Sequence, residues 1–142
     1  MSVHRQCIFI HGLEGSSQGF KATHLRQYYP DLLVPDFRGP IDERMEQLTH
    51  HLAANDQREG SGGQPQPWVI IGSSYGGLMA ILFAAHHPDR VAKLILFAPA
   101  LTRPFYAGEF PPTVTVPTVI DHGRNDTVVP LEPTRKFAER VC

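Results

Sequence analysis

The sequence has few of the features that mark secreted, membrane-spanning or nucleic-acid-binding proteins. It holds 2 cysteines in 142 residues, Cys7 and Cys142, so neither a disulfide framework nor a cysteine metal cluster is expected. No apolar run approaches the roughly 20 residues that a bilayer-spanning helix needs. The formal net charge is -1, and basic residues are scattered, which argues against a nucleic-acid partner.

The first six residues are polar and lack the charged segment followed by an apolar segment that forms a signal peptide. With so few cysteines, we expect a cytoplasmic protein. We also expect that it uses no metal and no cofactor. The 42% hydrophobic and 19% charged content is ordinary for a globular protein. The length fits a single domain over residues 1–142.

Short apolar runs alternate along the chain with segments of helical length and pattern. Buried strands are expected at residues 7–10, 32–34, 68–71, 94–97 and 116–120. Helices are expected at residues 20–29, 41–57 and 77–87, and from about residue 131 to the end. This alternation predicts an α/β fold: a doubly wound parallel sheet of about five strands in the order 2-1-3-4-5, with helices on both faces.

The most informative motif is Gly72-Ser73-Ser74-Tyr75-Gly76, which follows an expected strand and opens an expected helix. A serine at the tip of so tight a turn needs a strained backbone, and nearby glycines avoid side-chain collisions. Ser74 is thereby presented at a helix N-terminus, where unpaired amides favour negative charge. We predict that Ser74 is a nucleophile and Ser73 structural; the alternative is a glycine-rich turn that binds phosphate.

A glycine loop, His11-Gly12-Leu13-Glu14-Gly15, follows the first expected strand. Together with the serine turn it resembles the α/β-hydrolase fold of serine hydrolases, in its small, lidless, esterase-like members. In that fold the first core strand commonly ends in His-Gly, and the next loop donates an amide to the oxyanion hole. The resemblance assigns the oxyanion hole to the backbone amides of Leu13 and Tyr75, and His11 is expected to order the loop.

Two further turns agree with this resemblance. Asp36-Phe37-Arg38-Gly39 is similar to the Asp-x-Arg-Gly turn of many such hydrolases, where the role is structural. His122-Gly123-Arg124-Asn125-Asp126 resembles the acid turn, in which Asp126 takes the place of the carboxylate that orients the catalytic histidine. Asp121 is the competing acid, but it lies within an expected strand.

The sequence departs from the resemblance after Asp126, because no histidine follows it. A serine hydroxyl without a base is a poor nucleophile at neutral pH. His11 and His122 lie at strand ends that carry the site and are the candidates for a substitute base, although the His-Gly pattern accounts for both without catalysis. We therefore expect a C-terminally incomplete domain with an unpaired sheet edge, which favours a homodimer.

The implied reaction is hydrolysis of a small carboxylic ester or thioester through an acyl-Ser74 intermediate. The alternative is a catalytically impaired or truncated binding domain that keeps the pocket and lacks the base. Residues 99–115 have no helical period and contain Phe105, Tyr106 and Phe110 among prolines. This segment is expected to form either a pocket wall or a packed surface loop.

Overall fold

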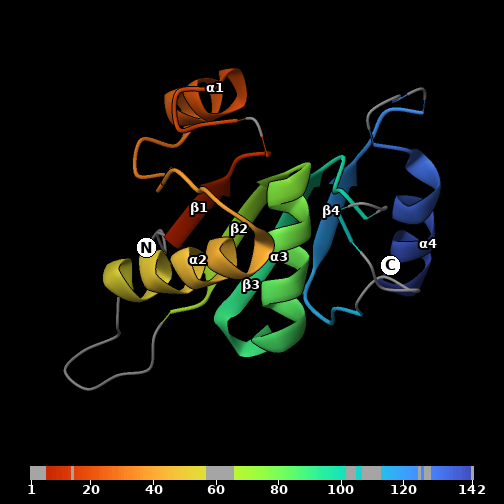
Figure 1. Ribbon diagram of the computed structural model, residues 1–142. Helices are drawn as coiled ribbons and strands as arrows, with labels where there is room; N and C mark the ends of the chain where they lie inside the picture. The colour runs from red at the N-terminus through yellow and green to blue at the C-terminus, as the bar shows by residue number, and fades with distance from the viewer. Residues whose placement is uncertain are drawn as a thin grey trace.

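The computed structural model describes residues 6–13, 15–56, 66–101, 105–106, 113–124, 126 and 129–141. Within this part of the chain, four strands form one parallel sheet in the order β1-β2-β3-β4. Figure 1 shows the four strands side by side, with the last helix beyond β4. The strands are β1 (Gln6–Ile10), β2 (Trp68–Ser73), β3 (Val91–Phe97) and β4 (Thr118–Asp121).

The second expected strand, residues 32–34, is not a full strand, which corrects the predicted number. Leu33 forms a single parallel bridge with Ile8 on the outer side of β1, with hydrogen bonds to Cys7 and Phe9. Prolines at positions 30 and 35 flank the segment, and a proline lacks the amide hydrogen that a longer ladder would use. The bridge nevertheless lies where the predicted order 2-1-3-4-5 puts this segment, and the α/β fold class is confirmed.

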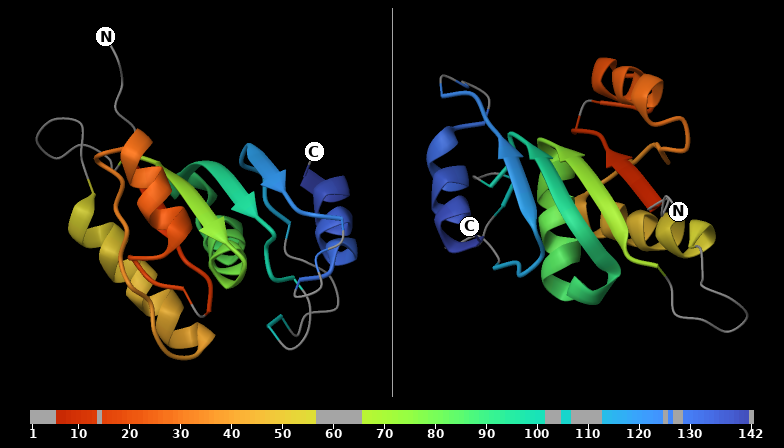
Figure 2. Two further views of the ribbon diagram at one scale, coloured as in Figure 1. Left: turned by 90° about the horizontal axis from the view of Figure 1, so that it is seen from above. Right: turned by 180° about the vertical axis from the view of Figure 1, so that it is seen from behind.

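Helices cover both faces of the sheet. They are α1 (Phe20–Tyr28), α2 (Ile41–Asn55), α3 (Tyr75–His86) and α4 (Leu131–Val141), with a short 3₁₀ turn at Pro88–Arg90. The larger core joins α2, α3 and Phe137 of α4 to the side chains on one face of the strands. A smaller core on the other face joins Ala22 of α1 to Phe9 and Ile71. Figure 2 shows this arrangement from above and from behind.

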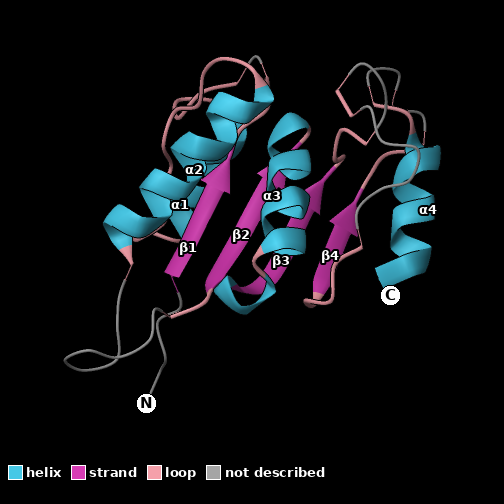
Figure 3. Cartoon of the chain, turned by 60° about the horizontal axis from the view of Figure 1, so that its bottom comes forward, coloured by secondary structure: helices cyan, strands magenta, loops and turns pink. Residues whose placement is uncertain are grey.

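The carboxyl ends of the four strands define the edge where a site is expected. In Figure 3 the four arrowheads point to the same edge of the sheet. His11 follows β1, Ser74 follows β2 and His122 follows β4, so the residues selected from the sequence share this edge. Open parallel sheets bind their ligands at such an edge. None of the helices in the described part of the chain has both the length and the hydropathy to cross a bilayer.

Candidate active site

Ser74 lies at the tip of the turn between β2 and α3, with φ 55° and ψ -115°. This positive φ is strained for a residue other than glycine, and strain of this kind persists where surrounding bonds hold it. The Ser74 amide donates to the Phe97 carbonyl at 2.9 Å. The Ser74 carbonyl accepts from the amides of Gly77 and Ala100 at 3.0 and 2.9 Å. β3 and the segment after it therefore fix the turn through backbone hydrogen bonds.

The glycines on either side of Ser74 allow the backbones to approach closely. A Cβ at Gly72 would lie 2.5 Å from the Gly76 carbonyl oxygen, and a Cβ at Gly76 would overlap the Ile10 carbonyl oxygen. Both contacts are with backbone atoms, which cannot rotate away as a side chain can. The turn therefore packs directly on the end of β1, and residues larger than glycine do not fit at these two positions.

The loop after β1 is held against Ser74. A Cβ built at Gly12 would lie 3.4 Å from the Ser74 Cβ. The Gly12 carbonyl oxygen is 2.6 Å from His11 Nδ1 and accepts from the Gly15 amide at 3.1 Å. In a trans peptide the carbonyl and the next amide point in opposite directions. Holding the Gly12 carbonyl therefore also fixes the direction of the Leu13 N–H.

His11 is buried, and both of its ring nitrogens have partners. The Phe37 amide donates to Nε2 at 2.9 Å, so Nε2 carries no hydrogen, and Nδ1 is the nitrogen that donates to the Gly12 carbonyl. This is the neutral imidazole of a residue that orders a loop, as the sequence predicts. Neither nitrogen can take a proton from Ser74 without losing a hydrogen bond.

The turn at residues 36–39 is hydrogen-bonded to the segment that follows β1. The Asp36 carboxylate accepts from the Ser17 amide at 2.7 Å and from the Ser17 hydroxyl at 3.0 Å. These hydrogen bonds favour the ionised form and lower the pKa of Asp36. Gly39 has φ 91°, which explains the glycine at the end of this motif. The structure thus gives Asp36 a structural hydrogen-bonding role.

Asp126 lies on the turn after β4, and its Oδ1 accepts from the Val129 amide at 2.8 Å. His122 Nε2 is 2.6 Å from the Val129 carbonyl oxygen and 3.7 Å from Asp126 Oδ2. The other nitrogen, Nδ1, is 2.9 Å from the Thr134 hydroxyl of α4. The imidazole therefore joins the turn to α4, and the His122 side chain is 2% exposed.

A cavity of about 420 Å³ brings the two parts of the site together, since Ser74 and Asp126 both line it. Ser73, Asp121 and Lys21 line it too. Asp121 ends β4 and Lys21 belongs to α1. The sequence pattern did not single out Lys21, because a lysine in the first turn of a helix is ordinary on a solvated surface.

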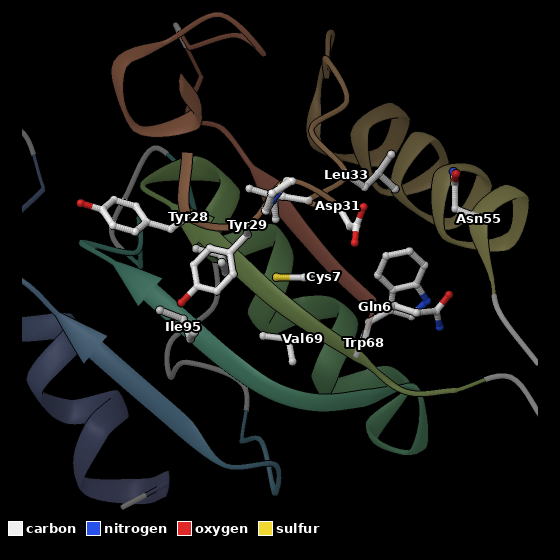
Figure 4. Close-up of a pocket in the computed structure, with 13 residues that line it drawn as sticks. Gln6, Cys7, Tyr28, Tyr29, Asp31, Leu33, Asn55, Trp68, Val69 and Ile95 are labelled. Carbon is white, nitrogen blue, oxygen red and sulfur yellow. The ribbon is translucent and has the colours of Figure 1, made fainter. Parts of the chain in front are cut away.

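A second cavity of about 800 Å³ lies away from Ser74, on the face of the sheet that α1 covers (Figure 4). Cys7, Val69 and Ile95 point into it from three neighbouring strands. Burial raises the pKa of the Cys7 thiol to about 11, so this sulfur is not a thiolate nucleophile at neutral pH. Further along this face, Val119 of β4 is 50% exposed. β4 is the last strand of the described sheet, and the homodimer predicted from an unpaired sheet edge stays a prediction.

Arg44 is a buried residue beside Tyr75 that the motifs of the sequence did not reveal. It is 4% exposed, and its Cζ lies 5.2 Å from the centroid of the Tyr75 ring. Phe105 contacts the same ring edge-on at 5.8 Å. The sequence did contain a signal of its burial. Arg44 begins the i, i+4, i+8 series that continues with Leu48 and Leu52 and forms the buried face of α2.

Phe105 and Tyr106 are half-buried and pack against the larger core, which fits both a pocket wall and a packed surface loop, and Phe110 lies outside the described residues. In the described part of the chain no three His, Cys, Asp or Glu side chains are grouped so as to hold a metal ion.

Comparison with known proteins identifies the family. A family model described as serine aminopeptidase, S33 matches residues 34–112. The lipase LipV of Mycobacterium tuberculosis is 44% identical over 50 residues, which cover 35% of this chain and 18% of the lipase. The matched part of the chain thus spans less than a fifth of the length of this curated relative.

Solved structures agree on the fold. The α/β-hydrolase domain-containing protein 10 from mouse matches with a TM-score of 0.77 and 18% identity, over 96% of this chain and 75% of that one. Est1E from Butyrivibrio proteoclasticus matches with a TM-score of 0.76 and 20% identity, over 96% of this chain and 74% of that one. Because the family model covers more than half of the sequence, the chain belongs to the serine aminopeptidase S33 family of α/β hydrolases.

Proposed function

We propose that this domain carries the site of a serine hydrolase, in which Ser74 attacks the carbonyl carbon of a small carboxylic ester or thioester. The observation that carries the proposal is the strained Ser74 turn at the start of α3, which lines one cavity with Asp126. Family membership supports hydrolysis as the reaction class. The likeness to a lipase favours an ester over an amide.

In the proposed reaction the Ser74 Oγ–carbonyl bond forms, and the carbonyl π electrons move to oxygen to give an oxyanion. The Leu13 and Tyr75 amides would donate to that oxygen, as preorganised donors whose positions cost no further ordering. Tyr75 is the first residue of α3, where amides have no carbonyl partner within the helix. The tetrahedral intermediate then expels the alcohol or thiol, and water later releases the acid and restores Ser74.

The Ser74 proton must go to a base, and the two histidines at the strand ends that carry the site do not offer a free ring nitrogen. His11 and His122 each have both ring nitrogens engaged. His86 and His87 lie at the other end of α3. In the proposal Asp126 is the acid that orients a histidine supplied from outside the described residues.

A second candidate function is a binding domain that keeps the cavity and does not turn over substrate. The engagement of His11 and His122 favours it, because a serine without a base reacts slowly. The two functions differ in the reactivity of Ser74, which can be measured directly.

The test is covalent labelling by a fluorophosphonate, with and without added imidazole, followed by mass spectrometry of the labelled peptide. We expect Ser74 to be labelled, Ser74→Ala to abolish labelling, and the neighbouring Ser73→Ala to keep most of it. Hydrolysis of p-nitrophenyl butyrate and of an aminoacyl p-nitroanilide then separates ester from peptide chemistry. Absence of labelling under both conditions would favour the binding domain, and labelling at Ser73 would overturn the assignment of the nucleophile.

A further inference from the structure

Arg44 is a buried cation in contact with both residues whose amides form the proposed oxyanion hole. Its Nη2 donates to the Leu13 carbonyl at 3.4 Å, and its guanidinium lies over the Tyr75 ring at 5.2 Å. Leu13 and Tyr75 come from different parts of the chain, the loop after β1 and the start of α3. One side chain on α2 therefore links the two sides of the hole.

The position of this guanidinium is fixed at its Nε atom. Nε donates to the Gly39 carbonyl at 2.8 Å, just before α2 begins. The larger core packs α2 beside α3, as Figure 1 also shows. Phe105 contacts the Tyr75 ring as well, so the ring has two neighbours that limit its movement. The cation is thus part of a packed, ordered cluster.

The charge of Arg44 has no carboxylate partner among the described residues, in contrast to Arg90, which pairs with Asp56 at 2.9 Å. Its Nη1 is buried and makes no hydrogen bond. An unpaired buried charge and an unsatisfied donor both cost free energy. Arg90 also has a buried nitrogen, Nε, without a hydrogen bond, so the missing carboxylate is what distinguishes Arg44. This unpaired charge points to a positive potential beside the proposed hole.

We propose that Arg44 is a positioning residue of the oxyanion hole. It holds Leu13 and Tyr75 in fixed positions relative to each other, and its charge, which no carboxylate among the described residues compensates, favours the negative tetrahedral state. The inference rests on the proposed function of Ser74. Because Arg44 is itself buried, its fixed charge acts more strongly on a developing anion than it would in bulk solvent. The neutral ground state gains little from it.

The experiment compares a ligand that becomes a tetrahedral anion with one that stays neutral. n-Butylboronic acid forms a bond from Ser74 Oγ to boron, and the hydroxyl proton leaves to solvent, so the adduct is a tetrahedral anion. Butyramide has a similar chain and forms no bond. Affinities of both are measured on the full chain by titrating the amide NMR signals of Leu13 and Tyr75.

Arg44→Met, which keeps much of the side-chain length, should weaken boronate binding by about 10-fold or more and change butyramide binding by less than about 2-fold. Arg44→Lys, which keeps the charge, should recover part of the loss. Arg90→Met is the matched control: it removes a half-buried, ion-paired arginine and should lower the melting temperature, but should leave boronate affinity unchanged. Equal losses for both ligands, or no loss, would overturn the proposal for Arg44.

Two further cases complete the test, one in which the proposed function itself fails and one in which Arg44→Met does not fold. If the wild-type chain binds no boronate, or if Ser74→Ala binds it equally well, the proposed function fails and the role of Arg44 fails with it. If Arg44→Met does not fold, Arg44→Lys is compared with Arg44→Gln. The charged variant must then bind boronate more tightly than the neutral one, and equal affinities would refute the role of the charge.

Discussion

The two halves of the candidate site are held by different kinds of interaction. The nucleophile half, residues 11–13 and 72–76, is fixed mainly by backbone groups: the Ser74 amide and carbonyl bind other segments, and glycines allow direct backbone contact. The acid half, residues 121–124, 126 and 129–134, has backbone hydrogen bonds at Asp121 and Asp126 but also depends on side chains. There the His122 imidazole reaches Val129 and Thr134.

This difference predicts how each half responds to mutation. Backbone packing leaves no room for a single added carbon, whereas a turn held by the His122 ring and the Asp126 carboxylate depends on those two groups and tolerates change around them. Gly123 illustrates the contrast, because a Cβ built there meets nothing within 4 Å. The nucleophile half should therefore be sensitive to added volume, and the acid half to lost hydrogen bonds.

The largest expected effect is that of Gly76→Ala. The new methyl group would overlap the Ile10 carbonyl, and a forced shift of packed backbone should cost about 3 kcal/mol of unfolding free energy. Labelling of Ser74 should fall as the turn is displaced. Gly123→Ala, measured by the same urea titrations, is the control and should be close to neutral. Equal effects of the two substitutions would remove the contrast between the halves.

His122→Ala comes next and tests the acid half. It would leave the Val129 carbonyl and the Thr134 hydroxyl without this partner in a buried place, at a cost of about 2 kcal/mol. His86→Ala, on an exposed position of α3, is the control and should change stability by less than about 0.5 kcal/mol. If Ser74 labelling disappeared while the fold stayed intact, His122 would be a base rather than a purely structural residue.

Asp126→Asn should have a smaller effect on this chain. The asparagine carbonyl can still accept from the Val129 amide, so the melting temperature should change little. The rate of Ser74 labelling should also stay within about 2-fold, because an acid that orients a histidine matters when the histidine is present. A severe loss of labelling would mean that the chain contains a base that acts through Asp126.

The sequence was most informative where function depends on backbone geometry. Gly72 and Gly76 predicted a close approach to Ser74, and the structure supplies the contacts with Gly76 and Ile10. The alternating pattern predicted the sheet and its order, apart from the strand that Pro30 and Pro35 restrict to one bridge. Motifs report such constraints because few residue types satisfy them.

Interactions between distant side chains could not be read from the sequence in this way. Arg44 is linked to Leu13 and Tyr75 only when α2 packs beside α3, and no local pattern encodes that contact. The hydrogen bonds of His122 to Val129 and Thr134 likewise depend on where α4 docks. The His-Gly pattern indicated that His122 was structural, but the partners that make it so come from tertiary structure.

The smallest effect expected is a pH dependence from Asp36, which supports the nucleophile half. Because the pKa of Asp36 is lowered in the folded protein, its contribution to stability is present above the ordinary Asp range and is lost as pH falls through the folded pKa. Melting temperatures of wild type and Asp36→Asn should therefore differ most at neutral pH and converge as the pH falls below the ordinary Asp range. Asp31→Asn, which removes another exposed carboxylate, is the control for the loss of a surface charge. A gap between wild type and Asp36→Asn that stayed constant with pH would mean that the Ser17 hydrogen bonds do not depend on the carboxylate charge.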